Sequence, residues 1–367
     1  MRILPHPPST RRAGFALSPR LAFVLLGLAL LAVVALSAGT GVNDEIGLAT
    51  SLHGFAAALG FADPLPLHQQ ITVEYRGLKI LTAIGVGASL ALSGALLQGL
   101  YRNDLASPGI LGISSGASLG ASLALLCLGG WAPLMHENLE GLSPNLVVAV
   151  SAFLGATLTA LFITTVATSD GRVSVPTLLL VGIAVNAAIG GALAAIRHFA
   201  LNDIELTRAI QYWGFGSLES ASGLQLSLVF GALGLSLLAL PFLGMELDLF
   251  AGGEEDARAL GVDTTRVKLA ALVIASLVAA LAVATAGQIG FIGLIVPHLL
   301  RLTVARSHRV LLPLCLIGGP LFLLGADLGQ HLLFGKALFP PSVLMSLFGG
   351  PFFLFLLLRH RRSIQSW

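Results

Sequence analysis

The sequence has few charged residues and few cysteines, and both shortages limit what the protein can be. Only 10% of its 367 residues are Asp, Glu, Lys or Arg, whereas 56% are hydrophobic; an average soluble domain carries about 25% charged residues. So little polar surface could not cover that much apolar side chain in water. Cys127 and Cys315 both lie in apolar runs with no motif spacing around them, which argues against a disulfide or a metal site.

Motifs for nucleotide binding and catalysis are also missing from the sequence. No segment matches G-x-x-x-x-G-K-[ST], and GQHLLFGK (329–336) has one residue too many. No group of His, Cys, Asp or Glu has metal-ligand spacing, and no Ser-His-Asp arrangement has local support. We therefore expect no catalytic centre, metal or cofactor on this chain. If ATP drives the protein, a separate chain must bind it.

Long apolar runs, in contrast, are abundant. In a lipid bilayer the backbone must satisfy its own hydrogen bonds, and these runs are too long and continuous for barrel strands. We predict an all-α polytopic membrane protein with about ten transmembrane helices. The weaker stretch Leu48–Phe61 is short and contains His53, so we expect it to lie on the membrane surface. The predicted spans are 20–39, 78–100, 111–129, 145–168, 175–196, 222–243, 266–286, 288–305, 311–331 and 341–358.

Lys and Arg are distributed unevenly between the two sides of these spans. With the N-terminus inside, 15 of the 20 lie in the cytoplasm, so the positive-inside rule predicts that both termini are cytoplasmic. We expect an N-terminal tail at 1–19, a transmembrane domain at 20–362 and a C-terminal tail at 363–367. STRRAGFAL (9–17) and the apolar run after it have the parts of a signal peptide, but the run is long for a signal core. We interpret it as a retained span, and its processing stays open.

Two segments concentrate small residues within the apolar runs. GVGASLALSGALLQG (85–99) and AGQIGFIGLIVPH (286–298) allow close helix approach or let the backbone line a cavity. Their placement in two halves, 78–196 and 266–358, predicts two inverted four-helix repeats around a midplane pathway.

Several ordered motifs resemble one transporter family from about Arg76 to Arg362. They are GASLALSGALLQGLYRNDLASPGILGISSGA (87–117), GGEEDARALGV (252–262), GQIGFIGLIVPHLLRL (287–302), HRVLLPL (308–314) and GGPFFLFLLL (349–358). Together they resemble the permease subunits of FecCD/BtuC-type ABC importers, which take up ferric siderophores, haem and cobalamin. The resemblance implies ATP-driven alternating access in the bacterial inner membrane, with an iron chelate as cargo and a ferric siderophore favoured.

The same resemblance implies the partners of the chain. We expect a second permease copy or a similar chain, two ATP-binding subunits that carry ATP and Mg, and a periplasmic substrate-binding protein. No nucleic acid partner is expected.

The turn after the second predicted span breaks the helix for a physical reason. Pro108 lacks a backbone donor, and Asn103, Asp104 and Ser107 bond readily to nearby backbone. The resemblance implies a cytoplasmic gate at this turn and at a second layer, formed by Asn103, Leu105, Ser174 and Val175. Asp104 replaces a Pro that is usual in the family, and Val175 replaces a hydroxyl residue that is commoner there.

A charged loop at about 248–264 lies between two spans on the predicted cytoplasmic side. Acidic residues near its start favour a short helix that Gly261 can end. The resemblance implies that this helix docks on the ATPase subunit through Glu254, Glu255, Ala257, Arg258, Leu260 and Gly261. A loop that only solvates the surface is the alternative.

Charges near the other side form a second group of candidates. The resemblance implies that Arg76, Lys79 and His331 receive acidic residues of the binding protein. Arg197 and His198 are candidates for the pathway entrance or for interfacial anchoring. Asp327 is the only acid within a predicted span and lies four residues before His331. It leaves open a proton-coupled secondary transporter, and a membrane scaffold without transport is the third class.

Overall fold

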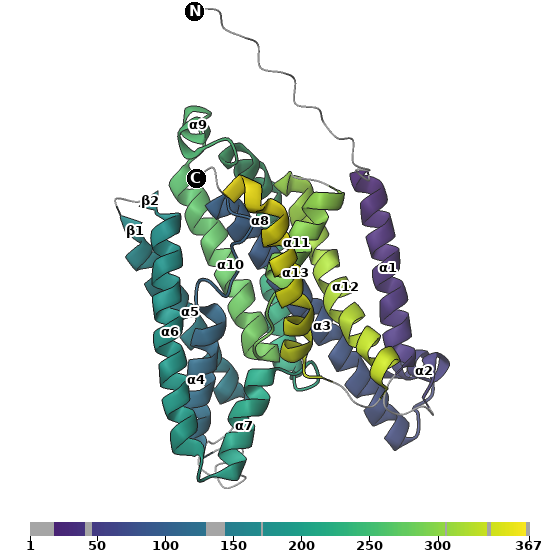
Figure 1. Ribbon diagram of the computed structural model, residues 1–367. Coiled ribbons are helices and arrows are strands. Elements are labelled where there is room, and N and C mark those ends of the chain that lie inside the picture. The colour runs from purple at the N-terminus through teal and green to yellow at the C-terminus, as the bar shows by residue number, and fades with distance from the viewer. Residues whose placement is uncertain are drawn as a thin grey trace, which may run out of the picture.

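The computed structural model describes residues 18–40, 46–129, 144–169, 172–304, 307–335 and 339–364. Most of the predicted tails at 1–19 and 363–367 lies outside these residues. Within them, seven helices are long and apolar enough to cross a membrane, and three shorter apolar helices accompany them. They coincide with the ten predicted spans, so the all-α polytopic class is confirmed (Figure 1). The long helices are α1 (Pro19–Gly39), α3 (Leu67–Tyr101), α5 (Pro144–Ala167), α6 (Val175–Ala200), α8 (Gly223–Phe250), α10 (Thr264–Ala286) and α12 (His308–Phe334); the shorter ones are α4 (Ile113–Leu128), α11 (Ile292–Thr303) and the apolar part of α13 (Pro341–Ile364).

The membrane helices alternate in direction, which defines two ends of the bundle (Figure 1). The start of α1, the end of α13 and the short helix α9 (Glu254–Ala259) lie together at the top of the figure. The helices α2 (Leu48–Ala58) and α7 (Ile204–Phe215) lie at the bottom. We call the first the inner end and the second the outer end, following the predicted orientation, which stays a prediction.

The two small-residue segments pack against each other in the core. A Cβ added to Gly94 of α3 would lie 1.8 Å from the carbonyl oxygen of Gly293 in α11, so only glycine permits this approach. Gly87 of α3 meets Gly319 of α12 in the same way, at 2.7 Å from the Gly319 carbonyl. Close helix packing is how membrane helices associate without a hydrophobic driving force. These glycines therefore place α3 at the centre of the bundle, where 89% of its most apolar 18-residue stretch is buried.

Both halves contain a backbone break followed by a short helix. The chain passes through left-handed conformations at Arg102 and Gly112 before α4, and at Gly287 and Phe291 before α11. The Phe291 ring rests on Gly349 of α13, where a Cβ would lie 2.2 Å from the ring. This correspondence supports the predicted repeats at 78–196 and 266–358, which stay a prediction.

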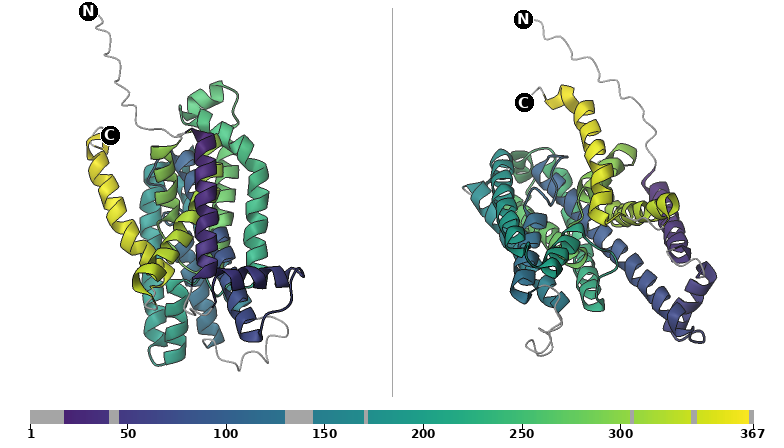
Figure 2. Two further views of the ribbon diagram at one scale, coloured as in Figure 1. Left: turned by 90° about the vertical axis from the view of Figure 1, so that its right-hand side faces the viewer. Right: turned by 60° about the horizontal axis from the view of Figure 1, so that its bottom comes forward.

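Three features lie outside the membrane helices. The helix α2 lies across the outer end beside α1 (Figure 2), and its place on the membrane surface stays a prediction. The strands β1 (Thr168–Ser169) and β2 (Arg172–Val173) pair antiparallel between α5 and α6. Neither this pair nor α7 was predicted from the sequence. Asp203 caps α7 by accepting a hydrogen bond from the Leu206 amide at 3.0 Å.

Candidate functional site

A large cavity, which we call the central cavity, lies between α4, α6, α7, α13 and the break before α11. Its volume is about 900 Å³. Hydroxyl and amide side chains dominate its polar lining, and Arg197 is the one charged residue among the described residues that line it. The aromatic rings of Trp213, Phe215 and Phe291 also face it. The polar lining residues are Ser115, Ser118, Ser122, Asn186, Gln211, Gln288, Ser342 and Ser346.

Asn186 connects the cavity wall to the turn before α4. It lies in the middle of α6 and accepts a hydrogen bond from Ser115 through Oδ1, while its Nδ2 donates to the Gly109 carbonyl at 3.2 Å. A polar side chain in the middle of a membrane helix needs such partners. The cavity wall and the predicted gate turn are thereby joined.

The four predicted gate residues lie in two turns outside the cavity lining. The Asn103 Oδ1 accepts from the Leu105 amide at 2.9 Å, which closes the turn after α3. Ser174 caps α6 by accepting from Thr177, and Val175 is the first residue of that helix. These contacts explain the local structure, and the gating role stays a prediction.

The two entrance candidates at the end of α6 separate in the structure. Arg197 lines the central cavity. His198 is exposed, does not line that cavity, and packs edge-on against Phe199 with ring centroids 6.2 Å apart. Arg197 is therefore the better candidate for contact with a cargo.

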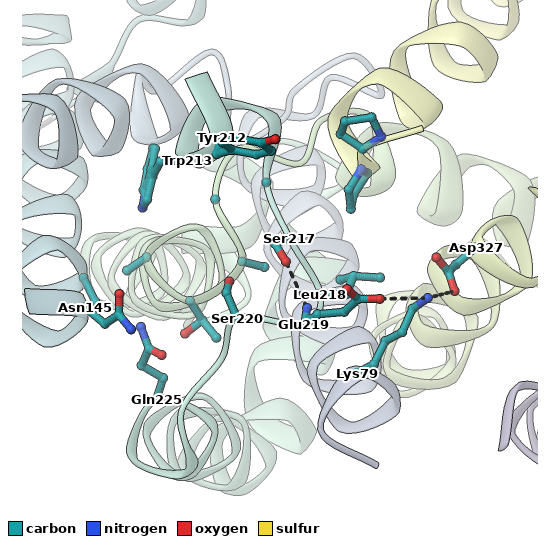
Figure 3. Close-up of a pocket in the computed structure, with 18 of the residues that line it drawn as sticks. Lys79, Asn145, Tyr212, Trp213, Ser217, Leu218, Glu219, Ser220, Gln225 and Asp327 are labelled. Carbon is teal, nitrogen blue, oxygen red and sulfur yellow. Dashed lines mark hydrogen bonds and ion pairs between the residues drawn. The ribbon is translucent and has the colours of Figure 1, made fainter. Parts of the chain in front are cut away.

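A compact network of charges lies at the outer end, around Lys79 of α3 (Figure 3). The Lys79 Nζ lies 2.9 Å from Asp327 Oδ2, 3.0 Å from His331 Nε2 and 3.5 Å from Glu219 Oε1. An ammonium carries three donors and no acceptor, and three acceptor atoms surround it here. We call Lys79, Glu219, Asp327 and His331 the outer network.

The outer network separates two cavities. Lys79, Glu219 and Asp327 line both a cavity of about 460 Å³ and one of about 290 Å³. The larger also contains Trp213, which faces the central cavity as well. Glu219 belongs to the segment between α7 and α8, so the network ties this part of the cavity wall to α3 and α12. The sequence analysis did not identify Glu219, because no sequence pattern relates residue 219 to residue 79.

Arg76 lies one turn before Lys79, but its guanidinium points into the protein. It is 7% exposed, and Nη1 donates to the carbonyls of Ala38 at 2.9 Å and Ile46 at 2.7 Å. Arg76 thereby ties α3 to the connection between α1 and α2. In this arrangement neither Arg76 nor Lys79 presents a free charge to a docking protein, and the docking role stays a prediction.

At the inner end, α9 is anchored through one acid. The Glu254 carboxylate lies 2.8 Å from both Arg258 Nη2 and Lys268 Nζ, and Ala257, on the inward face of α9, is fully buried. Partial burial favours the neutral acid, but hydrogen bonding and charge from Lys268 and Arg258 outweigh it and lower the pKa of Glu254 below its ordinary value.

The remaining coupling candidates lie on the surface of the same loop. Glu255 and Arg258 are exposed, Leu260 is 68% exposed, and Gly261 ends the helix with φ +87°. Leu260 is therefore accessible for a contact with another protein.

Asp248 is a further inner-end residue that was not predicted. Located near the end of α8, it accepts hydrogen bonds from the Ser307 hydroxyl and from the His308 amide and Nδ1. These contacts cap the start of α12. The stem of the α9 loop is thus joined to the helix that carries Asp327 at the other end.

Comparison with known proteins gives consistent results. The model of the FecCD transport family matches residues 22–359. The cobalamin import system permease of Halobacterium salinarum is 36% identical over 345 residues, covering 89% of this chain and 88% of that protein. The hemin transport system permease of Yersinia pestis is 39% identical over 294 residues, covering 80% and 84%. A solved inward-facing structure of an ABC transporter assigned to the metal-chelate type matches with a TM-score of 0.74 and 27% identity, covering 93% of this chain and 99% of that one.

Proposed function

The chain belongs to the FecCD transport family, and on this basis we propose that it carries a metal chelate, haem or a corrinoid across the bacterial inner membrane. It is a multi-pass permease of an ABC importer. Haem and cobalamin as cargo are supported by the names of relatives, whereas a ferric siderophore rests on the family resemblance alone.

The lining of the central cavity carries the proposal. A cavity of about 900 Å³ with hydroxyls, amides, aromatic rings and Arg197 suits a large cargo with many hydrogen-bond acceptors. A free divalent cation would call for carboxylate or imidazole ligands, and no Asp, Glu or His is among the described residues of this lining. A neutral or anionic complex therefore fits better than a bare metal ion.

The two ends of the bundle supply the remaining parts of the proposed cycle. A periplasmic binding protein delivers cargo at the outer end, and a second permease copy completes the pathway. Each of two ATPase subunits contacts the α9 of one permease copy. ATP binding and hydrolysis then expose the cavity alternately to the outer and the inner side. Exposed Leu260 above buried Ala257 supports α9 as the contact.

Asp327 has a structural partner, which bears on the secondary-transporter alternative. Its carboxylate lies 2.9 Å from the Lys79 ammonium, with a side chain only 10% exposed. This ion pair joins α12 to α3, which gives Asp327 a role in helix packing. The geometry therefore adds no support to proton coupling through Asp327.

The test is ligand-dependent ATPase stimulation in liposomes that contain the chain, its ATPase and its binding protein. Ferric siderophore, haem and cobalamin are compared, and one of them should stimulate hydrolysis. Full uptake without any ATPase subunit would overturn the proposal.

Arg197→Gln probes the cavity in the same assay. We expect it to raise the KM for an anionic cargo several-fold because the cavity loses its one cation, and to leave a neutral cargo unaffected. His198→Gln is the matched control, since His198 is adjacent but does not line the cavity. Equal effects of the two variants would contradict contact between Arg197 and the cargo.

A further inference from the structure

A separate polar cavity of about 330 Å³ lies at the inner end, where α3 and α8 end, α11 passes and α12 begins. Arg102, Arg301, His298 and His308 line it, whereas Asp104 is the one acid among the described lining residues. The central cavity does not share these residues. The surplus of cationic and titratable side chains predicts an affinity for anions.

Arg301 is held in place by one edge of its guanidinium. Its Nη1 donates to Gln98 Oε1 and lies 3.0 Å from Asp104 Oδ1, and Gln98 is itself fixed by donating to the Gly293 carbonyl at 3.0 Å. The Arg301 side chain is only 11% exposed. In the part of the chain that the structure describes, its Nε and Nη2 have no hydrogen-bond partner. A guanidinium fixed on one side with donors left on the other is preorganised for an oxyanion.

Two neighbours add donors around the same cavity. Arg102 takes a left-handed conformation at the end of α3, is exposed, and makes no ion pair with the described residues. His308 holds Asp248 through Nδ1, while its buried Nε2 has no partner within the described ranges. Ala251, from the loop that leads into α9, also lines the cavity.

We propose that this cavity, the inner anion site, binds the phosphate group of an anionic phospholipid in the adjacent leaflet. The free edge of Arg301 and the Arg102 guanidinium hold the phosphate oxygens through charge-assisted hydrogen bonds. The site does not depend on which cargo the protein carries.

The position of the cavity favours a lipid over a soluble phosphate. It lies at the ends of apolar helices, the level at which lipid headgroups meet a membrane protein. Leu302 lines it and is 49% exposed, so an apolar side chain stands at the cavity edge where an acyl chain would leave. Basic pockets between membrane helices at this face are typical sites for anionic headgroups.

The experiment measures thermal unfolding of the purified full-length chain in an uncharged detergent. Short-chain phosphatidylglycerol is titrated, with short-chain phosphatidylcholine and inorganic phosphate as separate arms. We expect phosphatidylglycerol alone to raise the unfolding temperature in a saturable way. Arg102→Gln should raise the half-saturating concentration of phosphatidylglycerol roughly tenfold, as expected for the loss of one charge-assisted contact.

Two further variants make the outcome specific. Arg301→Gln should abolish the shift, and if it does not fold, exposed Arg102 still carries the test. Arg309→Gln is the matched control, because Arg309 is exposed, belongs to the same end and does not line the cavity. It should behave as wild type.

Three results would overturn the proposal. Equal stabilisation of all variants would show a non-specific surface effect. A shift with inorganic phosphate but not with phosphatidylglycerol would assign the site to a soluble phosphate. No shift with any additive would leave the cavity to another occupant, such as an acidic side chain of the ATPase subunit.

Discussion

The two ends of the bundle both hold a buried cation, but among the described residues only the outer one is surrounded by an acceptor for each of its donors. At the outer end, the three donors of Lys79 have three acceptors on α12 and on the segment before α8. At the inner end, Arg301 uses a single nitrogen for both of its partners. A cation whose donors all face acceptors of the same chain holds helices together, whereas a cation with remaining donors can bind a group from another molecule. The outer end is therefore built for closure, and the inner end for contact with partners.

The largest expected effect tests the inner end as a contact surface. Leu260→Glu places a charge where α9 would meet the ATPase. We expect it to weaken that contact by about 2 kcal/mol or more, roughly thirtyfold in affinity, and to abolish ATP-driven uptake. Folding should be unchanged, because Leu260 is 68% exposed. Vesicle uptake and ATPase co-purification are the measurements.

Leu201→Glu serves as the control for that change, since Leu201 is 63% exposed at the outer end. It should retain ATPase binding. Normal uptake by the Leu260 variant would show that α9 is only a solvated loop.

The next effect tests closure at the outer end. Lys79→Met leaves the Asp327 carboxylate buried without its cation, so we expect a loss of about 3 kcal/mol in the free energy of unfolding. Removing both partners in Lys79→Met/Asp327→Leu should restore much of this loss, because the stranded charge is gone. Chemical unfolding in detergent provides the measurement.

Lys268→Met gives the matched inner-end comparison. Lys268 is as buried as Lys79, but the Glu254 carboxylate is 25% exposed and keeps Arg258 after this change, so the loss should stay below about 1 kcal/mol. Equal losses for the two lysine variants would remove the distinction between the ends.

Arg76→Gln separates a structural role from a docking role. The variant loses donors to two buried carbonyls, and we expect a loss of about 2 kcal/mol in stability, with little change in affinity for the binding protein. Arg76→Lys should not fully rescue it, because an ammonium lacks the planar fork. A lower affinity of the Arg76→Gln variant for the binding protein, with an unchanged free energy of unfolding, would instead support the docking role.

The smallest effect is a pH dependence at the inner end. The folded pKa of Glu254 lies below its ordinary value of 4.5. Its contribution is therefore complete above that pH and is lost as the pH falls through the lowered pKa. We expect Glu254→Gln to cost under about 1 kcal/mol at neutral pH and the difference from wild type to vanish in acid. A difference that grew on acidification would contradict this sign.

Composition and periodicity were enough to predict the class of the protein and its ten membrane helices. Apolar runs of this length have no stable alternative to the helix in lipid, so their number can be predicted without knowing how the helices pack. The short helix in the 248–264 loop followed from its acidic start and from Gly261. The small-residue segments were identified too, although their contact, Gly94 against Gly293, became visible only in the structure.

Side-chain direction could not be obtained in the same way. Arg76 and Lys79 were both predicted to receive acidic residues of the binding protein, yet the Arg76 guanidinium turns toward Ala38 and Ile46. The helix α7 was missed because it carries no long apolar run, and with it the placement of Trp213 in the cavity wall.

The sequence by itself determined that this chain is a membrane protein with about ten apolar helices, because the cost of exposing backbone and charge to lipid acts on each segment separately. Its motifs determined which transporter family it resembles. Only the tertiary structure decided which charged side chains are paired within the protein and which keep donors for another molecule. Residues 79, 219 and 327 come from three distant segments, and Arg301 lies 203 positions from Gln98 and 197 from Asp104. Their pairing depends on how whole helices pack, which no local pattern records.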